Sequence, residues 1–277
     1  MIALFLLAGT WACQSGTQQQ DTTEAVPEAL MEMSSNPGEA LVLEMVNASG
    51  GIEMLKSLND VEYEYVYDDV TAGKKDVSIE RYVFDGEYSW AEYTTREMFA
   101  FPKMEGKLIM GYDGNEAWCT MDGTVQEDSA MNKLADFMRK TNYYWFTMPF
   151  KLLDDGINYE HQGKKTIGEA EYEVVKISYG EGVGDVQDTY VLYLNPETKL
   201  LDAFLFTVMD FGMADPLLMF VEYQEVDGVK VPAFRKYAKA DWDGNILEDK
   251  WVENHFRNVK FNNGFTRDMF KKPASQS

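Results

Sequence analysis

Short alternations of apolar and polar residues, separated by tight-turn dipeptides, run through most of this sequence. Residues 61–67 carry Val or Tyr at every second position, which places large side chains on one face of a strand. The junctions between such segments include Asp-Gly at 85–86, 113–114 and 227–228, a dipeptide that favours hairpin turns. Short strands joined in this way predict an antiparallel sheet. The expected strands are 61–67, 77–85, 88–94, 107–112, 117–121, 159–162, 171–179, 189–194, 200–209, 217–224, 229–241 and 245–256.

Helical segments are few. Residues 39–47 suit a short helix with Glu39 in its first turn, where the helix dipole favours an acid, and 52–58 can add another turn. One longer helix begins after a cap at Asp128 or Ser129. Its expected apolar face contains Ala130, Leu134, Phe137 and Met138. No βαβ rhythm and no internal break are visible, so we expect a mainly β fold with a few short helices, in one domain over residues 38–277.

The N-terminus carries an apolar run that ends at a cysteine. Residues 1–12 are too short for a spanning helix, which needs about twenty residues, and fit the apolar core of a signal peptide. Ala12-Cys13 at its end resembles a lipobox, in which the Cys is diacylated and becomes the first residue. Thr10 departs from the Leu that this pattern prefers, and no basic residue precedes the apolar run. An ordinary cleaved signal peptide is the alternative.

A polar segment separates Cys13 from the first expected helix. Residues 13–37, rich in Gln, Thr, Glu and Ser, are expected to form a flexible tether that begins at the lipidated Cys. Acylation of Cys13 with more than one chain, such as palmitate, is sufficient for stable anchoring. Gln14 rather than Asp follows the Cys, which indicates the outer membrane in a common sorting rule. We therefore expect a lipid-anchored envelope protein that faces the periplasm.

The composition excludes several classes of function. The formal net charge of -22 would repel a phosphate backbone, so nucleic-acid binding is not expected, and membrane contact must come from the lipid. Only two cysteines are present, so a disulfide framework and a cysteine zinc site are excluded, and Cys119 is interpreted as a small buried residue. The two histidines exclude a His-rich metal site. No cofactor motif or catalytic constellation stands out, and we do not expect an enzyme.

Three segments carry a resemblance to known proteins. They are Met148-Pro149-Phe150-Lys151-Leu152-Leu153, residues 163–179 and the Asp188–Leu201 hairpin around Asn195-Pro196-Glu197-Thr198, followed by Gly228-Val229-Lys230-Val231-Pro232. Over residues 40–265 the chain resembles envelope lipoproteins related to the LolA and LolB lipoprotein carriers and to the mycobacterial lipoprotein LppX. The resemblance implies an open, curved antiparallel half-barrel of about eleven strands, with helices plugging its concave face. In the carriers that apolar concavity holds acyl chains, and no catalytic residues are implied.

The aromatic and Met-rich segments suggest where a hydrophobic ligand would bind. The 16 Met and 16 Phe suit an adaptable apolar surface better than a tidy aliphatic core. The candidate lining residues are Met98, Phe99, Phe101 and Met104 in one loop, and Tyr144, Trp145, Phe146, Met148 and Phe150 after the long helix. The alternative is a structural or interaction lipoprotein whose own side chains fill the core, with no ligand.

Arg81 is a further candidate on the second expected strand. If Val77, Ile79 and Val83 face inward, Arg81 shares their face. It can then bind the carboxylate or phosphate of a lipid, or it can pair with an acidic neighbour.

Overall fold

Thirteen antiparallel strands form one sheet in the computed structural model, which describes residues 34–180 and 188–274. Their order across the sheet is β6-β5-β4-β3-β2-β1-β13-β12-β11-β10-β9-β8-β7. The first six strands are β1 (Asp60–Asp69), β2 (Lys74–Val83), β3 (Tyr88–Arg96), β4 (Leu108–Tyr112), β5 (Ala117–Met121) and β6 (Thr124–Val125). The other seven are β7 (Ile157–Ile167), β8 (Ala170–Tyr179), β9 (Tyr190–Leu194), β10 (Leu201–Val208), β11 (Met213–Val226), β12 (Val229–Lys239) and β13 (Val252–Phe261).

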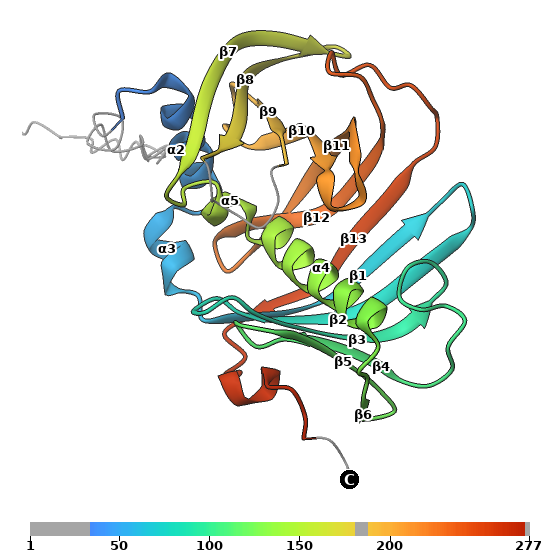
Figure 1. Ribbon diagram of the computed structural model, residues 1–277. Coiled ribbons are helices and arrows are strands. Elements are labelled where there is room, and N and C mark those ends of the chain that lie inside the picture. The colour runs from blue at the N-terminus through green and yellow to red at the C-terminus, as the bar shows by residue number, and fades with distance from the viewer. Residues whose placement is uncertain (1–33, 181–187, 275–277) are drawn as a thin grey trace, which may run out of the picture.

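The chain enters the sheet at its centre and leaves it there. β1 starts beside the position that β13 later fills, and successive hairpins build outward to β6 at one edge. Helix α4 (Ser129–Phe146) and the short α5 (Met148–Lys151) then cross to β7 at the opposite edge. The remaining hairpins return to the centre. In Figure 1 the sheet curves around α4, which lies across its concave side, so the expected open half-barrel with a plugging helix is confirmed.

Two of the described helices, α2 and α4, begin at a side-chain cap. The Asn36 side chain accepts hydrogen bonds from the backbone at the start of α2 (Pro37–Ala48), which packs against β7 and β8. The Asp128 side chain does the same for Ala130 and Met131 at the start of α4. α3 (Ile52–Ser57) and two 3-10 turns, η1 (Met209–Phe211) and η2 (Arg267–Phe270), complete the described elements.

The strands differ in detail from the sequence expectation. About eleven strands were implied, and the sheet has thirteen, one of them the two-residue β6. The last strand lies further along the chain than expected, over 252–261 rather than 245–256. The turn at residues 241–245 is present, with the Asp241 side chain accepting bonds from the backbone of Asp243 and Asn245. After it only Ile246 forms a bridge, to Ala240, and residues 247–251 belong to no strand. The long helix also extends further, so Tyr144 to Phe146 belong to its last turn and do not follow it.

Buried clusters lie on both faces of the sheet. The main core lies on the concave side and includes Tyr63, Phe146 and Phe204. On the convex side a smaller cluster that includes Tyr193 and Leu205 explains why all five residues of β9 are buried. The segment after β13 packs on the outside of the first strands, where the Trp118 ring nitrogen donates to the backbone carbonyl of Phe270.

Candidate functional site

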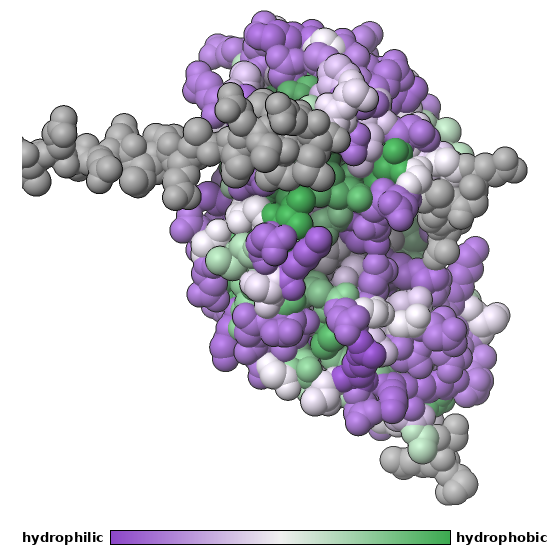
Figure 2. Space-filling view, turned by 90° about the vertical axis from the view of Figure 1, so that its left-hand side faces the viewer, coloured by the Kyte–Doolittle hydropathy of each residue, from purple (hydrophilic) through white to green (hydrophobic). Residues whose placement is uncertain are grey.

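A cavity of about 1240 Å³ lies along α4 inside the curved sheet. Its walls include residues of α4, residues on the concave face of β1 to β3, and residues of β9 to β12 on the other side of the helix. Figure 2 views the molecule from the side that carries α2 and α3 and shows hydrophobic residues gathered in the middle of a largely hydrophilic face. The volume exceeds the range of about 300–1,000 Å³ that is usual for ligand sites. The helix therefore does not fill the concavity.

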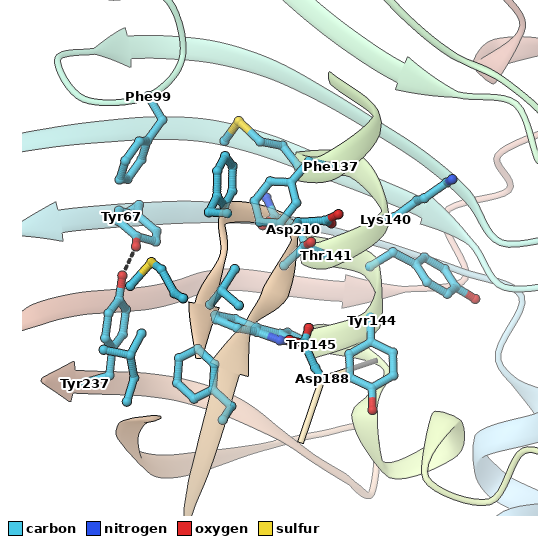
Figure 3. A pocket seen from close by; sticks show the side chains of 18 of the residues that line it. Tyr67, Phe99, Phe137, Lys140, Thr141, Tyr144, Trp145, Asp188, Asp210 and Tyr237 are labelled. Carbon is cyan, nitrogen blue, oxygen red and sulfur yellow. Dashed lines mark hydrogen bonds between the residues drawn. The ribbon is translucent and has the colours of Figure 1, made fainter. Parts of the chain in front are cut away.

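One face of α4 supplies much of the cavity wall. Phe137, Thr141 and Trp145 follow each other at intervals of four residues and project together toward the strands that carry Tyr67 and Tyr237 (Figure 3). Leu134 and Met138 also line the cavity. Of the apolar face that the sequence predicts for this helix, Leu134, Phe137 and Met138 are half-buried and Ala130 is exposed. This face contributes to the cavity, and a different face packs on the sheet.

The helix face that contacts the sheet contains a buried arginine. Met131, Ala135, Arg139, Tyr143 and Phe146 are the buried residues of α4. The Arg139 guanidinium lies 2.5 Å from a carboxylate oxygen of Glu80 on β2, and both side chains are completely buried. Such a pair tolerates burial only when its remaining hydrogen-bonding groups are satisfied.

Hydroxyl groups satisfy most of the remaining positions around this pair. Ser78 and Tyr82 donate to the Glu80 carboxylate at 2.7 and 3.0 Å, and Arg139 donates to the Tyr93 hydroxyl at 3.3 Å. The nearby carboxylate raises the pKa of Arg139 well above its ordinary value, although burial acts in the opposite direction. The network fixes α4 across β2 and β3 and so defines one boundary of the cavity.

Tyrosines form the sheet side of the cavity. Tyr65 and Tyr67 come from β1, Tyr237 comes from β12, and the hydroxyls of Tyr67 and Tyr237 are hydrogen-bonded to each other (Figure 3). Burial raises the pKa of Tyr237 to about 12 and raises the pKa of Tyr67 well above its ordinary value, so both stay neutral near pH 7. Phe99 packs edge-on against Tyr67, with 5.4 Å between the centres of the two rings. This part of the wall is aromatic and uncharged, which suits an apolar chain.

Charged groups on the cavity wall are largely paired. Each of the four lysines that line it forms an ion pair with a carboxylate: Lys140 with Asp136, Lys151 with Glu87, and Lys239 and Lys250 with Glu248. These pairs are partly exposed, so they contribute little binding energy of their own. No lining lysine is thus available as an unpaired cation.

Asp188 is the carboxylate most affected by this environment. It accepts hydrogen bonds from the Thr207 hydroxyl and the Met209 backbone, each at 2.9 Å, and Asp210 lies nearby (Figure 3). Its pKa is raised, chiefly by desolvation, with the negative charge of Asp210 adding to the effect.

Three of the ten candidate ligand residues line the cavity. They are Phe99, Tyr144 and Trp145. Phe146 and Met148 lie in the main core, and Phe150 packs against that core beside Phe84. Phe101 packs against a second core cluster under β3 to β5, while Met104 is exposed and Met98 is half-buried outside the cavity wall. The structure therefore does not bring the ten together as one lining.

Arg81 lies on the face of β2 that points away from the cavity. The buried residues of this strand include Asp76, Ser78, Glu80 and Tyr82, so the inward set is the reverse of the one assumed from Val77 and Ile79. The Arg81 guanidinium pairs with Glu62 at 2.6 Å and lies over the rings of Trp90 and Phe265. Pairing with an acidic neighbour, the second alternative for this residue, is what the structure shows.

Several lining residues were not singled out in the sequence. Tyr65 and Tyr67 were recognised as part of an apolar face but not as cavity residues, whereas Tyr190, Phe206 and Tyr237 gave no local signal. Their pairing partners are distant in the chain: Tyr67 meets Tyr237 across 170 positions.

Other expectations concern thiols, metals and the membrane. Cys119 is completely buried, as expected, and burial raises its pKa to about 11. Within residues 34–180 and 188–274, no three His, Cys, Asp or Glu side chains are grouped so that they could bind a metal ion. In the same residues no helix has the length and hydropathy needed to cross a bilayer. The expected leader, Cys13 and most of the tether lie outside the described residues.

Comparison with known proteins supports the fold. The model of a family of unknown function, DUF6503, matches residues 63–214, more than half of the chain. A LolA superfamily protein from Nitrosomonas europaea has a similar structure, with a TM-score of 0.51 and 11% identity over 85% of this chain and 97% of that one. A DUF1329 family protein from Desulfovibrio piger gives a TM-score of 0.50 and 14% identity over 86% and 98%.

The lipoprotein LppX of Mycobacterium tuberculosis is similar at a TM-score of 0.36, with 11% identity over 83% of this chain and 99% of that one. No curated protein matches the sequence. The resemblance to the LolA superfamily is thus confirmed at the level of the fold.

Proposed function

The chain belongs to the DUF6503 family, and we propose that it binds a hydrophobic ligand, a lipid or the acyl chains of a lipoprotein, in the cavity beside α4. The observation that carries this proposal is the volume of about 1240 Å³ left inside the curved sheet. A water-sized group takes up about 30 Å³, so the cavity has room for roughly forty groups of this size, enough for one or more acyl chains.

The chemistry of the cavity supports an apolar ligand. Its helix side presents Phe137 and Trp145, and its sheet side presents neutral tyrosines. A self-filled core, the alternative function class, predicts a concave face packed to interior density. The open volume along α4 therefore favours binding over a purely structural role.

Co-purification and probe binding test the proposal. Protein extracted gently should carry a hydrophobic molecule that native mass spectrometry detects. After that molecule is removed, the neutral fluorescent probe N-phenyl-1-naphthylamine should bind saturably and be displaced by dodecanol. Finding neither a co-purifying hydrophobe nor saturable probe binding would contradict the proposal.

We further propose that the protein is held at the envelope by a lipid on Cys13. The apolar run before it and the polar tether after it support this anchor. Wild-type protein should enter the detergent phase of a Triton X-114 extraction and fractionate with the outer membrane, whereas a Cys13→Ser variant should stay in the aqueous phase. Equal partitioning of the two proteins would rule out the anchor.

A further inference from the structure

Two buried polar residues on neighbouring strands have hydrogen-bonding groups with no partner in the described part of the chain. Arg235 on β12 is 3% exposed, and its Nε and Nη1 are unpaired. Asn254 on β13 is fully buried, and its Oδ1 is unpaired. The two residues are directly opposite each other in the β12–β13 register. These unpaired groups therefore form one cluster under the concave face.

This cluster lies directly behind the cavity wall. Nη2 of Arg235 donates to the backbone carbonyl of Trp145 at 2.8 Å, and Trp145 lines the cavity. Asn254 is directly opposite Tyr67 in the β1–β13 register, and Tyr237 lies two residues beyond Arg235 on β12. Both tyrosines belong to the cavity wall. The guanidinium therefore lies next to residues that line this end of the cavity.

An arginine without a counterion at this depth is unusual because burial of a charge is strongly unfavourable without one. Arg139 shows how the same fold compensates a buried guanidinium, with Glu80 at 2.5 Å. Arg235 has no such carboxylate among the described residues. The Phe256 ring at 5.2 Å and the Trp145 carbonyl are its neighbours, and burial lowers its pKa. The fold thus keeps a desolvated positive charge that no carboxylate of residues 34–180 or 188–274 neutralises.

We infer that Arg235 binds the oxyanion head group, a carboxylate or a phosphate, of a ligand whose chain fills the cavity. This inference rests on the proposed hydrophobic ligand and specifies its class as an anionic amphiphile. The two unpaired donors of Arg235 suit an oxyanion, since a guanidinium binds carboxylate and phosphate through paired N–H groups. The head group reaches them when the side chain of Trp145 or Tyr65 turns aside.

The lining lysines are poorer candidates for this role. Each is already paired with a carboxylate at the cavity wall. An anion there would meet the acidic partner as well as the lysine, whereas at Arg235 it would meet an uncompensated charge.

Matched twelve-carbon ligands test the inference. Dodecanoic acid, dodecyl phosphate and dodecanol are titrated calorimetrically into the delipidated protein at pH 8. Wild type should bind one of the anions, or both, about tenfold or more tightly than dodecanol, as expected for hydrogen bonds to a charged group. The stronger of the two anions identifies the head group as carboxylate or phosphate.

Three variants locate the effect. Arg235→Met should bring the affinity for the anion down to that for dodecanol and leave dodecanol binding within about twofold, because only the head group loses its partner. Arg235→Lys keeps the charge without the paired donors and should retain part of the preference. Arg81→Met, on the opposite face, is the control and should bind all three ligands like wild type.

Thermal unfolding of each variant separates binding from folding. Arg235→Met removes an uncompensated buried charge, so its melting temperature should not fall. The inference is overturned if wild type does not prefer the anions, or if Arg235→Met keeps that preference, which would mean that another group binds the head group. Failure of dodecanol to bind wild type would instead contradict the proposed function itself.

Discussion

Arg139 of α4 and Glu80 of β2 form a fully buried ion pair, with 2.5 Å between guanidinium and carboxylate. The pair joins the helix that crosses the concavity to the inner face of the sheet, over 59 positions of sequence. By helix periodicity Arg139 lies on the side of α4 opposite to Phe137, Thr141 and Trp145, which line the cavity. The position of the cavity wall therefore depends on a polar contact that the cavity itself does not contain.

Breaking this pair on one side should strongly destabilise the protein. Arg139→Met leaves the Glu80 carboxylate buried without its counterion, and we expect the free energy of unfolding in urea to fall by about 3–5 kcal/mol. The double variant Glu80→Leu/Arg139→Met buries no charge at this site, so its free energy of unfolding should fall clearly less than that of Arg139→Met. Arg81→Met removes a half-exposed pair and should change stability by less than about 1 kcal/mol. Equal losses in the single and double variants would show that the charges are not coupled.

Filling the cavity should compete with the ligand. Thr141→Trp places a large ring on the helix face that lines the cavity, so the affinity for N-phenyl-1-naphthylamine should drop about tenfold or more. Lys133→Trp introduces the same ring at an exposed position of α4 and should bind the probe like wild type. Unchanged probe affinity in Thr141→Trp would mean that the probe binds elsewhere on the protein.

Most of the sheet could be predicted from the sequence because its signals are local. The Asp-Gly turn at 113–114 gives the observed pairing of Tyr112 with Ala117, and Asp85-Gly86 gives the pairing of Val83 with Tyr88. β6 could not be predicted, since two residues carry no periodicity. The start of β13 was predicted too early, because residues 247–251, which follow the turn at Asp241, belong to no strand.

The site was harder to predict because β2 and α4 each bury a charged residue and leave apolar residues half-buried. β2 turns Glu80 inward and leaves Val77 and Ile79 half-buried, and α4 turns Arg139 inward. Each of these arrangements is possible only because the two charged residues meet each other, and one sequence does not reveal such a distant pairing. The outer face of β2 was also misread, because a segment distant in sequence covers it. Phe265 in that segment packs against Arg81, so apolar residues occur on the outer face as well.

The Cys119 thiol should be unreactive in the native protein. It is completely buried, and its pKa is raised to about 11, so almost no thiolate is present at pH 8. In a Cys13→Ser background, mass spectrometry should show no carbamidomethylation after treatment with iodoacetamide, and one modification per chain after unfolding in urea. A Cys13→Ser/Cys119→Ser variant is the control for other sites. Rapid native labelling would mean that the second core opens readily.

Asp188 should make the protein less stable as the pH rises. Its pKa is raised in the folded state, so the folded protein binds the proton more tightly than the unfolded chain does. The stability that protonation contributes is therefore fully present below the unfolded pKa of about 3.9 and is lost as the pH rises through the folded pKa. At pH 7 the wild type consequently keeps a partly desolvated carboxylate beside Asp210.

Asp188→Asn removes this unfavourable charge and keeps an oxygen that can accept from Thr207 and Met209. Because the site is partly exposed, the free energy of unfolding at pH 7 should rise by about 0.5 kcal/mol, which corresponds to a rise of roughly 1–2 °C in Tm. The difference between variant and wild type should shrink toward zero near pH 3, where the native carboxyl is protonated. Thermal unfolding followed by circular dichroism at both pH values measures it. A variant that is less stable than wild type at pH 7 would show instead that the hydrogen bonds to the ionised carboxylate outweigh its desolvation.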